Sequence, residues 1–133
     1  MTQSNRNRTG VEQCHNHIGG MLGEAIFKFL LKEKWIENID EELSITDKGW
    51  EQLEIMGIDV NLLKNTKRKM INVCSESDHG IFHEHIGAHL GLLLNELMIE
   101  KNWLEKKSGK NMELTDLGIV GLSSLGVDIK KII

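Results

Sequence analysis

The sequence has no proline, only two cysteines, and no long uncharged run of apolar residues. Without proline, its turns must be made by glycine, asparagine, aspartate and serine. Cys14 and Cys74 are too few for a disulfide framework, so we expect them to be thiols or metal ligands in a reducing compartment. No stretch has the length of a membrane-spanning helix or the layout of a signal peptide. We therefore expect a cytoplasmic protein that makes no contact with a membrane.

Motifs for catalysis are missing as well. The chain has no nucleophile elbow, no phosphate-binding loop and no HExxH zinc motif, so we expect that it is not an enzyme. A net charge of −4 also argues against non-specific capture of nucleic acid, which needs a basic surface. Its 133 residues, 40% of them apolar and 27% charged, fit one ordinary domain or two small units with a shared core.

The chain carries one pattern twice. Shifting the sequence against itself by 68 residues, and by 69 after one inserted residue, aligns fourteen positions over most of each unit. The aligned pairs are His15/His83, His17/His85, Ile18/Ile86, Gly19/Gly87, Leu22/Leu90, Gly23/Gly91, Trp35/Trp103, Glu37/Glu105, Thr46/Thr115, Asp47/Asp116, Gly49/Gly118, Leu53/Leu122, Gly57/Gly126 and Asp59/Asp128. We divide the chain into a flexible tail (1–12), a first repeat (13–62), a linker (63–79) and a second repeat (80–133).

Each repeat predicts a long helix, a two-stranded wing and a second helix. Apolar residues from Ile18 and from Ile86 recur with the helical period, and short strands follow Trp35 and Trp103, which we expect to anchor the core. Thr46 and Thr115 are predicted N-caps of the second helices. Helix, wing and helix form the back half of a winged-helix domain. We predict an α+β fold in which two such tandem repeats pack about an approximate two-fold axis.

Two pairs of glycines accompany the long helices. Gly19 and Gly23, like Gly87 and Gly91, are four residues apart, and glycine inside a helix costs roughly 0.5–1 kcal/mol relative to alanine. A close approach of the two long helices would compensate for this cost. The alternative is a helix that begins later than its apolar pattern suggests.

Thiol and imidazole groups near the helix starts suggest a transition-metal site for Zn or Ni. If the first long helix begins before Cys14, then Cys14 and His17 share a face with Met21, and His85 and His89 share the matching face of the second. Cys74 would complete a mixed nitrogen–sulfur site. The histidines also fit a structural role at helix starts, or a sensor of protons or of a small molecule. No cofactor follows with certainty.

The combined motifs resemble the C-terminal half of a subgroup of ArsR-like transcriptional regulators. The resemblance rests on "CHNHIGGMLG" with "LSITDKGWEQLEIMGID", and on "HIGAHLG" with "MELTDLGIVGLSSLGVD". By position, Cys14 and His17 match the cysteine–histidine pair of that subgroup's first module, and Cys74 and His85 match the pair of its second. Cys74 lies eleven residues before His85, a longer gap than the family pattern has. The helix-turn-helix that reads DNA in such regulators has no counterpart in this chain.

The resemblance implies a non-enzymatic regulatory module that senses an effector or fixes subunit geometry, and that forms a homodimer or another homo-oligomer. DNA would be contacted through a domain not present in this chain. Two alternatives stay open: a stand-alone transition-metal-binding protein, and a winged-helix DNA-binding protein. In the last case Lys106, Lys107 and Lys110 of the second wing would touch phosphate, although the first wing, "ENIDEE", is acidic.

Overall fold

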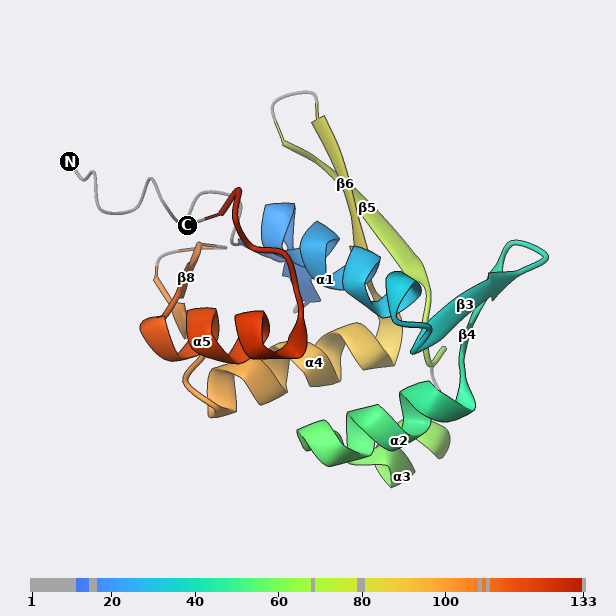
Figure 1. Ribbon diagram of the computed structural model, residues 1–133. Coiled ribbons are helices and arrows are strands. Elements are labelled where there is room, and N and C mark those ends of the chain that lie inside the picture. The colour runs from blue at the N-terminus through green and yellow to red at the C-terminus, as the bar shows by residue number, and fades with distance from the viewer. Residues whose placement is uncertain are drawn as a thin grey trace.

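A computed structural model describes residues 12–14, 17–67, 69–78, 81–107, 109 and 111–132 (Figure 1). Over these residues the fold is mixed α+β, with five helices and four separate two-stranded antiparallel sheets. No helix of this part of the chain combines the length and the apolar character needed to cross a membrane.

The elements of the first half are β1 (Glu12–Cys14), β2 (His17–Gly19), α1 (Gly20–Lys32), β3 (Ile36–Ile39), β4 (Glu42–Ile45), α2 (Asp47–Met56) and α3 (Val60–Lys64). Those of the second half are β5 (Val73–Asp78), β6 (Ile81–Ile86), α4 (Ala88–Glu100), β7 (Leu104–Lys106), β8 (Met112–Leu114) and α5 (Asp116–Leu125). Each strand pairs with its neighbour in the chain. The segment expected to be a linker, 63–79, therefore contains the end of α3 and all of β5.

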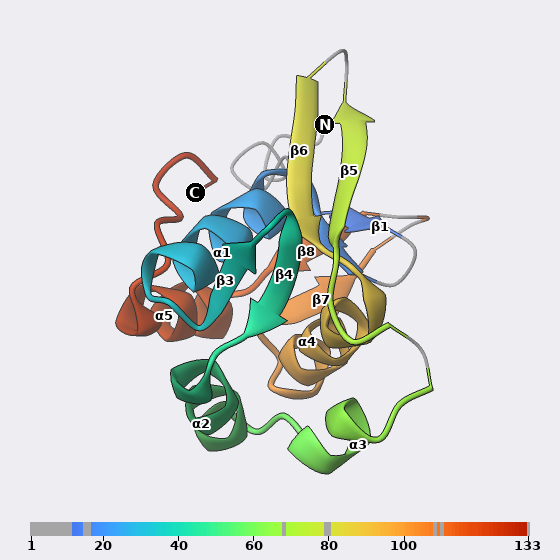
Figure 2. The same ribbon diagram turned by 90° about the vertical axis from the view of Figure 1, so that its right-hand side faces the viewer.

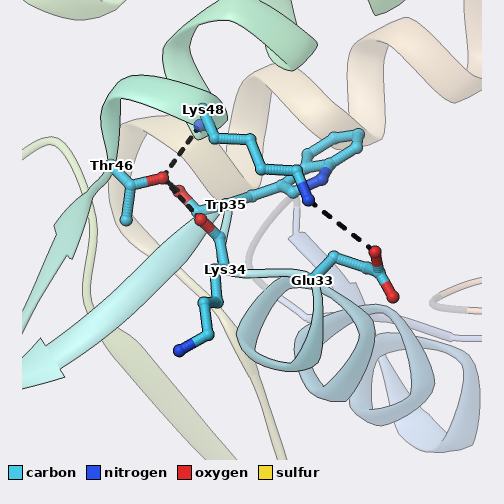
Figure 3. Close-up of polar contacts among 6 residues, drawn as sticks. Glu33, Lys34, Trp35, Thr46 and Lys48 are labelled. Carbon is cyan, nitrogen blue, oxygen red and sulfur yellow. Dashed lines mark hydrogen bonds and ion pairs between the residues drawn. The ribbon is translucent and has the colours of Figure 1, made fainter.

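The junction of wing and helix is built from a threonine and a glycine. Thr46 is the N-cap of α2, and its hydroxyl accepts a hydrogen bond from the Gly49 amide at 2.9 Å (Figure 3). The same hydroxyl donates to the carbonyl oxygen of Lys34 at 2.5 Å, while the Thr46 amide donates to the carbonyl of Trp35. A Cβ atom at Gly49 would overlap the Trp35 carbonyl oxygen. The Thr-Asp-x-Gly motif thus holds the first turn of α2 against the backbone of Lys34 and Trp35, where α1 leads into β3.

The second half repeats this junction closely. Thr115 caps α5 with dihedral angles of −80° and 169°, against −78° and 169° for Thr46. Its hydroxyl accepts from Gly118 at 2.9 Å and donates to the Asn102 carbonyl at 2.6 Å. A Cβ atom at Gly118 would overlap the Trp103 carbonyl oxygen. The two helices end alike too, at C-cap glycines 57 and 126, which have φ angles of 120° and 109°.

Both long helices begin later than their apolar periodicity predicts. Ile18 and Ile86 are buried but lie in β2 and β6, and the helices start at residues 20 and 88. Gly19 and Gly87 are extended N-cap residues and not part of a helix face. The expected close approach of the two long helices is also wrong for Gly23, because a Cβ atom there would overlap the carbonyl oxygen of Ile18 in β2 and lie 2.9 Å from the Cβ of His85 in β6. This glycine lets α1 lie close to a strand.

The two halves pack across each other. Helix α1 packs against β6 of the second half, and α4 packs against β2 of the first. The C-cap glycines also contact the long helix of the other half: Gly57 lies beside Leu97 of α4, and Gly126 lies beside Phe29 of α1. A small cavity lies where the halves meet, and it is lined by Ile18, Gly23, Ile26, Ile86, Gly91 and Leu94, three pairs related by the 68-residue shift.

The core is continuous between the halves. Leu22, Leu53, Leu90 and Leu122, which are two pairs related by the shift, are completely buried in one apolar cluster. Trp35 is buried in it and meets Phe29 edge to face, with ring centroids 5.2 Å apart. Neither half therefore has a core of its own.

Candidate functional site

The strongest concentration of metal-type residues lies in the hairpins that precede the long helices. In the register of β1 and β2, Cys14 is paired with His17. In the register of β5 and β6, Cys74 is paired with His85. Residues directly opposite one another on antiparallel strands share a face of the sheet, with their Cβ atoms about 4.5–5.5 Å apart. Each hairpin therefore sets one cysteine opposite one histidine.

The two hairpins lie next to each other at the junction of the halves. Strand β2 contacts β6, and α1 covers β6. The ring of His85 is completely buried, and Cys74 is half-buried. The hairpin β5–β6 also extends well away from the helices, as Figure 2 shows. The buried base of this hairpin, where His85 lies, is the part that meets the first half of the chain.

The predicted helical geometry of these ligands is wrong. Cys14 and His17 are on strands and not one turn apart on a helix, and His85 is on β6 while His89 is on α4. His89 instead faces the segment that follows α3, where its Nδ1 lies 2.7 Å from the hydroxyl oxygen of Thr66. The structure thus pairs Cys74 with His85 but gives His89 a different neighbour.

Among the side chains that the structure describes, no three histidine, cysteine or acidic groups converge as metal ligands. Only the backbone is described for Cys14 and His17, so the four-residue set of the two hairpins is defined by register. The sequence offered a signal for the β5–β6 hairpin: Asp78, the last residue of β5, is followed by His79 and Gly80 before β6 begins, and aspartate and glycine at such a point are typical of a turn. The helical period that continues into Ile86 concealed it.

The wing lysines give a weak basic surface. Lys106 is exposed on β7, and the Nζ of Lys107 lies 3.2 Å from the Glu113 carboxylate on β8. Lys110 lies outside the described residues. The other wing, β3–β4, exposes acidic side chains at Glu37, Asp40 and Glu41, so the two wings differ in charge.

Comparison of sequences points to the class of transcriptional regulators: over 94 residues the chain is similar to a bacterial helix-turn-helix-type regulator. The relative is described as an uncharacterized HTH-type transcriptional regulator, YdfF, of Bacillus subtilis (strain 168). The two are 26% identical over 68% of this chain.

The match covers 39% of the length of that relative, so the chain corresponds to less than half of it. No domain-family model matches the chain. No solved structure matches it either.

Proposed function

We propose that the chain is a non-enzymatic regulatory and dimerisation module of an ArsR-like transcriptional regulator. The observation that carries the proposal is the similarity over 94 residues to a regulator named for its helix-turn-helix. The nearly identical caps of α2 and α5, and the packing of each long helix on the other half, support two winged-helix-like repeats related by an approximate two-fold axis. Such a module would act in the cytoplasm, where its DNA-binding domain finds its target.

Helix α5 offers the surface for self-association. Its outer face exposes Leu117 and Val120, which are 60% and 64% accessible, together with Ser123 and Ser124. The positions of α2 that correspond to the two apolar residues are Lys48 and Glu51, both charged and exposed. Two exposed apolar side chains one helical turn apart, where the other half has a lysine and a glutamate, suit contact with the same face of a second copy.

Light scattering on the purified chain tests this assignment. We expect the mass of a dimer, and we expect Val120→Glu to give a monomer because it buries a charge at the contact. Lys48→Glu on the corresponding face of α2 is the matched control and should leave the dimer intact. A chain that stays monomeric at every concentration would remove the dimerisation role.

Duplex DNA should bind the isolated chain only weakly. Strong salt-dependent retention of DNA that is lost in Lys106→Glu would favour the DNA-binding alternative.

A second candidate function is the binding of a transition metal. Its support is the pair of cross-strand registers, Cys14 with His17 and Cys74 with His85, on two hairpins that touch. Two thiolates and two imidazoles form a donor set suited to tetrahedral Zn, and Ni accepts the same groups. In a regulator, such an ion would tie the two repeats together at their junction.

Metal content per chain decides this candidate. Protein freed of metal by chelation and then dialysed against Zn or Ni should retain one ion per chain, with a raised melting temperature. Cys74→Ser should abolish retention, whereas His89→Asn should not, because His89 faces Thr66. Equal metal content in both variants, or a melting temperature that Zn and Ni leave unchanged, would contradict the four-residue site.

A further inference from the structure

A groove of about 520 Å³ opens between α1 and the segment that follows α5. Figures 1 and 2 both show this C-terminal segment running beside α1. The volume lies within the range of about 300–1,000 Å³ that is usual for small-molecule sites. The groove belongs neither to the hairpins with the cysteines nor to the outer face of α5.

The groove combines an apolar floor with basic groups. Met21, Ala25 and Phe29 of α1 and Ile132 of the C-terminal segment supply apolar surface. Lys32 and Lys131 are exposed beside it, and neither forms an ion pair with any described residue.

The other charged groups of the groove are Glu24, Lys28 and Asp128. Lys28 is 3.0 Å from the Glu24 carboxylate one turn earlier on α1. A carboxylate oxygen of Asp128 accepts from the Lys130 amide at 3.2 Å. The lining therefore holds three lysines and two carboxylates, and their net charge of +1 is the charge that a ligand would meet.

The corresponding place on α4 is covered by another part of the chain. There α3 and the residues after it lie against α4, with Leu63 completely buried and Thr66 bonded to His89. The backbone amides of His89 and Leu90 donate to the carbonyls of Lys69 and Met70. On α1, Ile132 takes the position of Leu63.

The lysines of the groove have no counterparts at the corresponding place on α4. By the same shifts, Lys28, Lys32 and Lys131 correspond to Glu96, Glu100 and Leu62. The place on α4 that corresponds to the groove on α1 therefore has two glutamates where the groove has two of its lysines. This difference argues for an anionic occupant and against a simple copy of the α3 contact.

We propose that this groove is an effector site for a small amphipathic carboxylate, a monoanion with an apolar body. The apolar body would lie on Phe29, Ala25 and Met21, and the carboxylate would be held between Lys32 and Lys131. The proposal deepens the regulatory function, because it names the class of molecule that the module would sense. It makes no use of the cysteine–histidine hairpins.

Calorimetric titration of the whole chain with decanoate, below its micelle concentration, tests the site. We expect saturable binding of one decanoate per chain, and much weaker binding of decyltrimethylammonium, which has the same tail and the opposite charge. Lys32→Glu with Lys131→Glu should weaken decanoate binding by about tenfold or more, because charge-assisted hydrogen bonds are lost and repulsion replaces them.

Lys67→Glu with Lys106→Glu changes the net charge equally at exposed residues outside the lining of the groove, and should leave decanoate affinity within about twofold of the parent. Ala25→Phe should fill the floor and reduce binding without a change of charge. Retained melting transitions will identify folded variants. Equal binding of both amphiphiles, or equal decanoate binding by the two lysine pairs, overturns the proposal. Because the readout is ligand binding, a failed dimerisation test leaves this result to be judged independently.

Discussion

Residue 88 shows how closely the two halves share backbone geometry. Ala88, the first residue of α4, has a φ angle of 58°, and Gly20, the first residue of α1, has a φ angle of 63°. The left-handed region costs an L-residue roughly 1–2 kcal/mol, a cost that glycine avoids. The second half therefore carries backbone strain at a position where the first half does not.

Replacing Ala88 by glycine should stabilise the protein. We expect Ala88→Gly to raise the free energy of unfolding by about 1 kcal/mol, since relief of the left-handed strain exceeds the entropic cost of a glycine. Urea unfolding followed by circular dichroism measures this change. Ala25→Gly, in the interior of α1, is the matched control and should lower stability by roughly 0.5–1 kcal/mol. A loss of similar size in both variants would show that residue 88 is not strained.

Asn95 is a second residue at which the halves differ. Its side chain is 3% exposed, and its Oδ1 has no hydrogen-bond partner among the described residues. The corresponding residue of α1 is Phe27, which is also buried. A buried polar atom without a partner costs about 1–3 kcal/mol.

Asn95→Leu should therefore raise stability, by roughly 1–3 kcal/mol, because a leucine of similar size removes the unsatisfied carbonyl. The melting temperature measured by differential scanning calorimetry should increase accordingly. Asn95→Asp keeps the size but buries a charge, and should lower it. A fall in melting temperature for the leucine variant would mean that the amide makes an interaction that the fold requires.

At the scale of elements, the wings and second helices could be predicted because their signals are local. Thr46 and Thr115 are the N-caps of the second helices, and Gly57 and Gly126 are their C-caps. The strands that precede these helices follow from short apolar runs. The hairpins before the long helices could not be predicted in the same way. Ile18 and Ile86 fit the helical period as well as they fit a strand, and only pairing with β1 and β5 distinguishes the two.

The same dependence on strand pairing determines the geometry of the candidate cysteine–histidine site. Cys14 and His17 are three residues apart, a spacing that suits one helical face and a tight hairpin equally. Cys74 and His85 are brought together by the whole length of β5–β6, which the sequence spacing of eleven conceals. The residues of the two cross-strand pairs could be named from the sequence, but their geometry depended on contacts between strands.

The Thr-Asp-x-Gly junction yields a prediction for the elements it joins. Thr46→Ala should lower stability by about 1 kcal/mol, because the Gly49 amide and the Lys34 carbonyl lose their partner. Gly49→Ala should cost more, since its Cβ would overlap the Trp35 carbonyl and displace α2 from the corner. Chemical denaturation measures both.

The conservative change Thr46→Ser keeps the hydroxyl and serves as the control, with most of the stability retained. The pair Thr115→Ala and Gly118→Ala should reproduce the same order in the second half. If Gly49→Ala were harmless while Thr46→Ala were not, the close seating of α2 on the Trp35 carbonyl would be contradicted.

At the scale of the whole molecule, the halves share one core but differ on their surfaces. Each long helix packs on a strand of the other half, so both halves contribute residues to a single core. Outside it, the groove on α1 is lined by Lys28 and Lys32, while the corresponding residues of α4 are Glu96 and Glu100. On the outer face of α5, Leu117 and Val120 correspond to Lys48 and Glu51 of α2. The two halves therefore share a core and differ in the charge of their surfaces.

The central claim is that this chain supplies assembly and regulation while another domain reads DNA. The most direct test is to fuse it to a helix-turn-helix domain that binds its operator only as a dimer, and to measure operator affinity. We predict that the fusion binds at least about tenfold more tightly than the isolated domain, because dimerisation raises the effective concentration of the second site. We predict that Val120→Glu abolishes this gain and Lys48→Glu preserves it. A fusion that binds its operator no better than the isolated domain would contradict the account.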